Sequence, residues 1–283
     1  MYSAKIENAM GEVLELTHNP LYIVESITGL NPPNANINTN SNANFDGATY
    51  NSSKLNPRNI VITLLPRGNV EQSRITLYKY VKVKQFIRFY FKNGSRDVFI
   101  DGYVENFDCD FFENPQKAQI SIICPYPYFS DMNINSYELS FIQDAFTFPF
   151  CTNEGESFIF GSHVEYGRAV IVNDSDVAIG AIIKFTMQNG VDEPRIFKEN
   201  TGEYIKISGS YYRGDIITIN TIDGQKSITL TRYGKESNLL NSMVVGSTWL
   251  KVDTGNNTFY LDADTGMDDL LCTITATMQY EGV

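Results

Sequence analysis

The residues that could do chemistry in this chain are few, and their spacing does not build a catalytic frame. There are two histidines, and His163 stands beside Ser162 and near Glu165 in the segment FGSHVEYG. Neighbours along a strand point to opposite faces, so this adjacency does not by itself assemble a Ser-His-acid arrangement. The chain also lacks a G-x-S-x-G nucleophile motif. We therefore expect no enzymatic activity, although sequence alone leaves a Ser-His-acid site open.

Two groups of carboxylates imitate known sites. In LDADTGMDD, Asp262 and Asp264 fit the first and third positions of a calcium loop, but Met267 stands where that loop requires glycine. A carboxylate-rich β-turn is the better interpretation. Asp108 and Asp110 invite comparison with a glycosidase, whose two carboxylates lie about 5–9 Å apart. Any pair of alternating strand residues meets that spacing, so the pattern is uninformative.

The remaining short motifs also favour structural roles. The triplet RGD, Arg213 to Asp215, resembles an integrin-binding sequence, yet Gly-Asp is ordinary turn chemistry at the start of a strand. The cysteines at positions 109, 124, 151 and 272 match no C-x-x-C pattern. We predict buried free thiols, with no metal and no cofactor.

Charge is distributed unevenly along the 283 residues. Residues 1–130 carry twelve Lys/Arg and twelve Asp/Glu, whereas residues 131–283 carry ten and twenty-one, which accounts for the whole net charge of −11. Sequence-specific nucleic-acid binding needs a basic surface, so it is not expected. Neither a signal peptide nor an apolar run long enough to insert into a membrane is visible.

The first half of the chain predicts a β domain with one helix, residues 1–132. Asn69 can cap a helix of about residues 70–82, with Gln72 three positions later as in a capping box. Its predicted apolar face contains Ile75, Leu77, Tyr78 and Val81. Asn93-Gly94 marks a hairpin between two strands.

Residues 29–53, GLNPPNANINTNSNANFDGATYNSS, form an Asn-rich segment that is almost free of large aliphatic residues. Such a segment cannot bury a face of its own. It is either a mobile surface loop or an arm, such as a long hairpin, that becomes ordered against a neighbouring subunit.

After a predicted linker, residues 133–148, the second half shows eight short β runs separated by turn clusters. This pattern is typical of a jelly-roll β-sandwich, residues 149–283. The predicted fold class is therefore mainly β, with an N-terminal β-sandwich or split barrel and a C-terminal sandwich.

Several stretches, in order, resemble the distal tail (Dit) proteins of long-tailed bacteriophages that infect Gram-positive hosts. They are ITGLNPPNANINTN with DGATYNSSKLNPRNIVITL, then VFIDGYVENFDCDFFENPQKAQISIICPYPYF. The third set lies in the second half, from GRAVIVNDSDVAIGAIIKF through GDIITINTIDGQKSITL to GSTWLKVDTGNNTFYL. The resemblance implies a non-enzymatic virion protein with a galectin-like C-terminal sandwich. Its expected place is the distal end of a phage tail, or of a phage-derived tail-like particle, after synthesis in the host cytoplasm.

The same resemblance implies specific partners. Family members form a homo-hexameric ring that joins the tail tube, or major tail protein, to the tail-tip apparatus. Expected neighbours are a tail-associated lysin-like hub, the tape measure protein and, in many phages, a receptor-binding protein. The alternative is a carbohydrate-binding, lectin-like adhesion module. Trp249, the sole tryptophan, is its candidate sugar platform, although a core position suits its strand context better.

Two sets of residues are candidates for interaction. The arm set is Asn31, Pro32, Pro33, Asn36, Asn38, Asp46 and Gly47, and the inter-domain seam set is Cys124, Pro125, Tyr126, Pro127, Tyr128 and Phe129. In the seam, two prolines remove backbone donors and should stop the preceding sheet from continuing, and one X-Pro bond could be cis. We expect deletion of residues 31–44 to weaken ring assembly, and isolated residues 149–283 to remain monomeric.

Overall fold

The structure is a computed structural model that describes residues 2–41, 46–144, 161–165 and 167–283. It divides into two units, the first comprising Met1–Met132 with Gln279–Val283, and the second Asn133–Met278. The chain passes between the units twice, inside β10 (Phe129–Glu138) and inside β24 (Leu270–Tyr280). Residues 133–138 and 140–144, predicted as part of a linker, form strands of unit 2. Residues 279–283, predicted to belong to the second domain, belong to unit 1.

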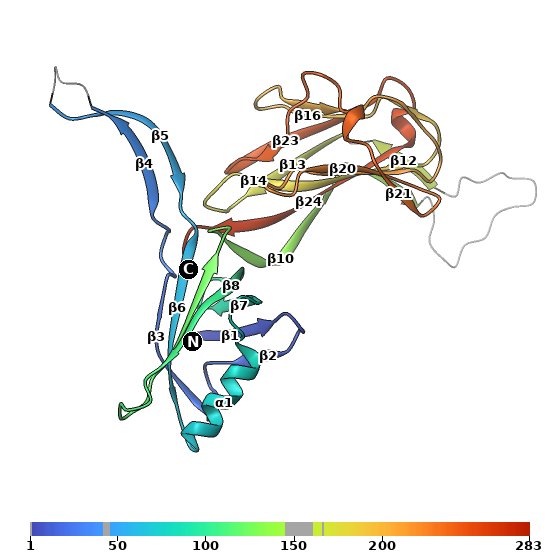
Figure 1. The fold of residues 1–283 in the computed structure, drawn as a ribbon. Helices are drawn as coiled ribbons and strands as arrows, with labels where there is room; N and C mark the ends of the chain where they lie inside the picture. Colours follow the sequence, from blue (N-terminus) through green and yellow to red (C-terminus); the bar gives the residue numbers. More distant parts are fainter. Residues whose placement is uncertain (1, 42–45, 145–160, 166) are drawn as a thin grey trace, which may run out of the picture. The chain divides into compact units, whose positions relative to one another are not determined.

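Unit 1 is a β domain with a single helix among its described residues (Figure 1). Its elements are β1 (Ser3–Asn8), β2 (Val13–Glu15), β3 (Tyr22–Thr28), β4 (Ala35–Asn40), β5 (Thr49–Leu55), β6 (Arg58–Pro66), α1 (Val70–Tyr80), β7 (Phe86–Lys92), β8 (Asp97–Cys109), β9 (Ala118–Cys124) and the start of β10. The strands pair in the order β2-β1-β7-β8-β9-β6-β3, and β8 also pairs with β10. β4 and β5 form a separate two-stranded sheet.

Alternation of side chains explains the core of unit 1. In β6, Ile60, Ile62 and Leu64 are fully buried while the residues between them are not, as expected for a strand with one covered face. In the antiparallel pairing with β9, they lie opposite the equally buried Ile122, Ile120 and Ala118, respectively. The predicted hairpin at Asn93-Gly94 is confirmed as the β7–β8 connection, with Lys92 opposite Asp97.

The helix begins where the capping residue predicted, because the Asn69 side chain accepts a hydrogen bond from the Gln72 amide at 3.2 Å. Its predicted apolar face is wrong in part. Leu77 and Val81 are buried, whereas Ile75 and Tyr78 are 45% and 39% exposed. The helix also ends two residues earlier than predicted, at Tyr80, with Val81 as its C-cap.

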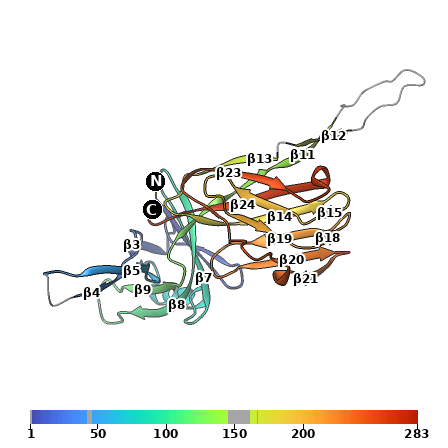
Figure 2. The ribbon, with the colours of Figure 1, turned by 90° about the horizontal axis from the view of Figure 1, so that it is seen from above.

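Unit 2 is a β-sandwich. Its elements are the end of β10, β11 (Ser140–Asp144), β12 (Gly161–Glu165), β13 (Arg168–Asn173), β14 (Ile179–Met187), β15 (Val191–Asp192), β16 (Arg195–Lys198), β17 (Tyr204–Lys206), β18 (Ser210–Tyr211), β19 (Ile216–Asn220), β20 (Ser227–Arg232), β21 (Lys235–Asn238), η1 (Leu240–Ser242), β22 (Lys251–Val252), β23 (Gly255–Asp262), η2 (Met267–Asp269) and β24. One sheet has the order β24-β14-β19-β20-β21 and another β13-β23-β16-β17 (Figure 2). The predicted mainly β fold class is confirmed.

Candidate interaction site

The predicted arm is a β-hairpin. β4 and β5 pair antiparallel from Ala35↔Leu55 to Asn40↔Thr49, and every residue of β4 is exposed. The hairpin is bounded at its base by a hydrogen bond from the Asn56 amide to the Asn34 carbonyl, 2.9 Å. Figure 1 shows it continuing away from the end of the β3–β6 pair. The predicted arm residues fall into three places: Asn31, Pro32 and Pro33 before β4, Asn36 and Asn38 within it, and Asp46 and Gly47 just before β5.

Arg58, the first residue of β6, holds the base of this arm. Its side chain is 3% exposed, and its Nη1 donates to the Gly29 and Asn31 carbonyl oxygens at 2.5 and 2.6 Å. Its Nε donates to the Pro127 carbonyl at 2.7 Å, and its Nη2 donates to the Glu281 carbonyl. One guanidinium therefore joins three segments that are far apart in the sequence: the arm base, the seam and the segment of residues 279–283.

An arginine reaches this buried position because it occupies the core-facing phase of β6. Arg58 lies in register with Ile60 and Ile62 on the covered face of the strand. The ring of Phe129 lies under the guanidinium, 4.5 Å from Cζ to the ring centroid, and is itself fully buried. Burial lowers the pKa of Arg58 from its ordinary value, because the charged form loses hydration there. The four carbonyl dipoles replace part of that hydration.

Gly29 lets the arm base approach β6 closely. Its φ of +86° is a backbone conformation that L side chains rarely adopt. A Cβ at this position would also stand 2.1 Å from the Asn59 carbonyl oxygen. Both constraints exclude a side chain where the arm leaves the domain.

Residues 279–283 lie along the same region and add a second set of bonds. The Val283 amide donates to the Leu30 carbonyl at 3.1 Å, and Arg96 donates to the Gly282 carbonyl. The Arg96 guanidinium also lies over the ring of Tyr280, 4.1 Å from the centroid. The arm base is therefore closed by a segment that follows the whole of unit 2 in the sequence.

The seam residues take up different positions along this cluster. Cys124 ends β9 and is fully buried, which raises the pKa of its thiol to about 12, so it stays protonated at neutral pH. Tyr126 donates to Gln279 Oε1 at 3.0 Å, and its ring lies edge-on to Tyr128, 5.2 Å between centroids. Pro125 is exposed, Pro127 supplies the carbonyl to Arg58, and Phe129 opens β10. The cis peptide bond of the described residues is Asn114-Pro115, and none of the seam bonds.

The structure thus joins part of the arm set to part of the seam set. Asn31 and Pro127 both accept hydrogen bonds from Arg58, while Asn36 and Asn38 stand out along the hairpin. Arg58 is absent from both predicted sets. The signal that would have found it is the alternation of RNIVITLL, in which an arginine occupies the same phase as three buried aliphatic residues.

The motifs of unit 2 are structural. Arg195 forms ion pairs with Asp262 and Asp264, and Lys206 Nζ lies 3.1 Å from Asp264. Basic side chains therefore neutralise the carboxylates of the acidic turn. In the RGD triplet, the Asp215 carboxylate is buried and accepts from Arg232. No cluster of metal-ligating side chains occurs in the described ranges of the chain.

The remaining candidates are single residues or close neighbours in the sequence. Trp249 is half-buried, and Lys226 Nζ lies 5.8 Å from its ring centroid. Asp108 and Asp110 are both exposed at the end of β8. The side chain of His163 and the whole of Cys151 lie outside the described residues. Among described helices, none is long and apolar enough to cross a membrane.

Comparisons with known proteins show a similarity to components of bacteriophage tails. Residues 174–280 match the family model described as the siphovirus-type tail component, C-terminal domain. The structure is similar to that of the Dit protein of phage SPP1, described as a paradigm of the hub adsorption apparatus in phages infecting Gram-positive bacteria. The TM-score is 0.66 at 12% identity, over 99% of each chain. It is also similar to chains of the phage P2 baseplate in its activated conformation with Ca and with Sr, with TM-scores of 0.53 at 12% identity over 100% of each chain. No curated protein matches the sequence.

The β-sandwich of unit 2 and the family match point to one class: residues 174–280 are similar to the C-terminal domain of siphovirus-type tail components. The chain as a whole has the fold of the SPP1 Dit protein. The resemblance to the distal tail (Dit) family is thereby confirmed.

Proposed function

We propose that this chain is a structural hub protein at the distal end of a phage tail, where six copies form a ring that joins the tail tube to the tail tip. The observation that carries the proposal is the β4–β5 hairpin, which is exposed along its length yet held firmly at its base by Arg58. A two-stranded sheet is marginal in water unless a further surface covers it. A rigid base with an uncovered hairpin suits a contact with a neighbouring copy.

The comparisons support the same proposal. The similar SPP1 protein is described as a hub and the similar P2 chains come from a baseplate. The further neighbours of this chain in the tail would be the tube protein, the tape measure protein, a lysin-like hub and a receptor-binding protein. The ring contacts need no catalytic group, so the proposed role is non-enzymatic.

The test is removal of the hairpin from the purified protein. Because Asn34 and Asn56 are already hydrogen-bonded across the base, residues 35–55 can be replaced by a short glycine turn without moving Arg58. Light scattering and negative-stain images should show six-fold rings for the intact chain and their loss for the variant. Circular dichroism should show both chains folded. Rings that persist without the hairpin would refute the arm's role in assembly.

A further inference from the structure

The hairpin has one apolar face, which its pairing register defines. Residues directly opposite one another in an antiparallel pair point to the same side of the sheet. Ile37 lies opposite Ser53 and Thr39 opposite Tyr50, and the Tyr50 hydroxyl is 2.9 Å from Ser53 Oγ. We name this side the apolar arm face, and its six residues are Ala35, Ile37, Thr39, Tyr50, Ser53 and Leu55.

A β-bulge brings the tyrosine to that face. The register shifts between Asn38 and Thr39, so that Asn51 in β5 has no direct partner in the pairing. With regular alternation, Tyr50 would share a side with Ser52, which pairs with Asn38. The extra residue therefore moves the one aromatic side chain of these strands to the side of Ile37.

The opposite side is polar. It carries Asn36, Asn38, Asn40, Thr49, Ser52 and Lys54, and Asn38 donates to Ser52 Oγ at 3.0 Å. Ile37 and Tyr50, on the apolar arm face, are 60% and 62% exposed. Segregating apolar from polar residues on a hairpin has no use when both sides face water, so the apolar arm face has the character of a contact surface.

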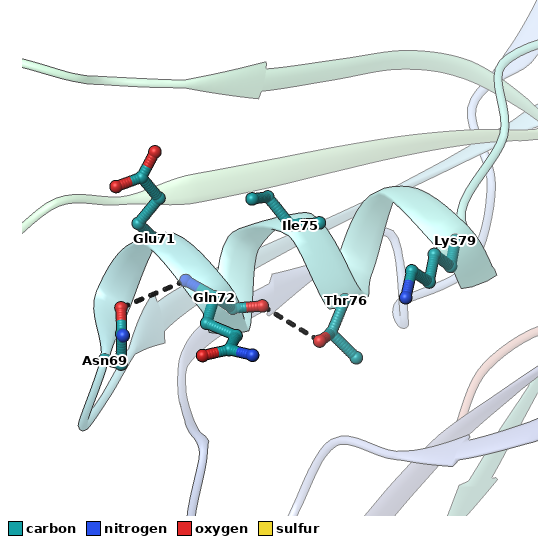
Figure 3. A pocket seen from close by; sticks show the side chains of 6 residues that line it. All are labelled: Asn69, Glu71, Gln72, Ile75, Thr76 and Lys79. Atoms are coloured by element: carbon teal, nitrogen blue, oxygen red, sulfur yellow. Dashed lines mark hydrogen bonds between the residues drawn. The ribbon is translucent and has the colours of Figure 1, made fainter.

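A second uncovered surface of matching character lies on α1. The outward side of the helix has a shallow depression of about 300 Å³, lined by Asn69, Glu71, Gln72, Ile75, Thr76 and Lys79 (Figure 3). Ile75 is its one aliphatic side chain. We name this surface the α1 face. Its charges, Glu71 and Lys79, cancel, as do Asp46 and Lys54 in residues 29–55, so neither surface repels the other.

These two surfaces stand at opposite ends of one strand. The arm enters β6 at Arg58, and β6 runs to Pro66 before α1 begins at Val70. At 3.3 Å per residue, β6 separates them by about 25 Å, and the hairpin extends away from α1 (Figure 1). An arm therefore cannot cover the α1 face of its own chain. Two different surfaces that pair between copies form a heterologous contact, which builds a ring when the rotation between copies closes and an open filament when it does not.

We propose that the apolar arm face of one copy docks on the α1 face of a second copy, with Ile37 and Tyr50 covering Ile75. This inference rests on the proposed ring and names the partner surface within it. The charge-neutral, amide-rich lining of the α1 face suits a hairpin that presents one aliphatic and one aromatic residue among hydroxyl groups.

The first test compares the two sides of the hairpin by sedimentation of the full chain. The double variant Ile37→Asn with Tyr50→Ser should weaken self-association by at least about 30-fold, since both apolar contacts are lost. The matched control, Asn36→Ser with Asn38→Ser, changes two residues of the same strand on the polar side and should stay within about threefold of the wild type. Equal effects of the two variants would overturn the proposal, as would a wild-type chain that stays monomeric at the highest attainable concentration.

The second test mixes two variants that are each expected to be monomeric. The Ile37→Asn, Tyr50→Ser chain keeps an intact α1 face, and an Ile75→Gln chain keeps an intact arm. Their mixture should form a 1:1 complex that stops at two copies, because only one productive arm and one productive α1 face remain. Absence of this complex would refute the docking pair. If hairpin removal abolishes rings but the arm-face variant assembles normally, the proposed function stands and this inference fails.

Discussion

Arg58 is the side chain that holds the base of the projecting hairpin. Its four hydrogen bonds all end on main-chain carbonyl oxygens, in three separate segments. A planar guanidinium can serve several acceptors from fixed directions, which a lysine ammonium cannot do. The hydrogen bonds at the arm base are thus set by backbone geometry, because each acceptor is a main-chain carbonyl.

Replacing Arg58 with leucine should destabilise unit 1 by about 3 kcal/mol or more, because buried carbonyl oxygens lose their donor. Urea unfolding followed by far-UV circular dichroism measures this loss. The matched control is Arg88→Leu, which removes a half-exposed ion pair with Asp101 and should cost less than about 1 kcal/mol. Equal losses in the two variants would contradict the central role of Arg58.

Asp215 makes unit 2 sensitive to acid. The Arg232 guanidinium holds the pKa of this buried carboxyl below its ordinary value, and an amide hydrogen bond from Tyr212 adds to the effect. The unfolded chain therefore takes up the proton first as the pH falls. The stabilisation is fully present above the ordinary carboxyl pKa, about 4, and is lost as the pH falls through the lower folded value.

We expect the urea midpoint of unit 2, followed by the fluorescence of Trp249, to fall as the pH drops below about 5 and towards about 3. Asp215→Asn should lower the midpoint at pH 6 and reduce its dependence on pH. The reduction is partial, because the pKa of Asp192, Glu193, Glu199 and Asp223 is also lowered. A variant with an unchanged pH dependence would show that this pair does not control acid sensitivity.

Among individual residues, local sequence favoured a structural role for the acidic turn and for the RGD triplet. In the turn, Met267 stands where a calcium loop requires glycine, and in the triplet, Gly-Asp is an ordinary turn sequence. Local sequence did not predict the neighbours of Arg58. Those neighbours come from positions 29, 31, 127 and 281. Contacts at such separations follow from the tertiary fold and leave no local periodicity in the sequence.

Segments of secondary structure show which local signals are strong. The cap at Asn69 and the alternation in β6, β14 and β24 were sufficient to place those elements. The two-residue strands β15 and β18 are too short to create a period. In the arm, the bulge at Asn51 breaks the alternation that would have revealed the apolar arm face.

The segment of residues 279–283 offers a test at this scale. A Cβ on Gly282 would stand 3.0 Å from Pro32 Cδ and 3.3 Å from its nitrogen. Gly282→Val should therefore lift the segment from the arm base, with a cost of about 1–3 kcal/mol. Hydrogen exchange should quicken at Val283, whose amide is bonded to Leu30. The control is Gly94→Val in the β7–β8 loop, where nothing lies within 4 Å, and exchange at residues 279–283 should not change.

For the molecule as a whole, the division of charge follows the division of structure only approximately. The acidic excess lies in residues 131–283, while Asp131 and Glu281 belong to unit 1. The order of the two halves was accessible from turn spacing and from the family resemblance. The return of residues 279–283 to unit 1 was not, because the alternation of β24 continues smoothly across the boundary.

If the ring contacts lie in unit 1, residues 133–278 expressed alone should be monomeric, and the intact chain should self-associate. Analytical ultracentrifugation over a wide concentration range measures both. The hairpin-deleted chain, which keeps both units, serves as the reference for a monomer of known mass. A stable hexamer of residues 133–278 would move the ring-forming surface to unit 2.

The bond from Arg58 to the Glu281 carbonyl also sets an order of events during synthesis. A ribosome delivers residues 1–132 first, and these contain the hairpin, β6 and α1. The carbonyl that completes the arm base emerges only after all 146 residues from Asn133 to Met278 have been translated. A nascent chain therefore carries an unfinished arm base until residue 281 has emerged, which delays pairing with neighbouring chains on the same message until unit 2 of each copy has been made.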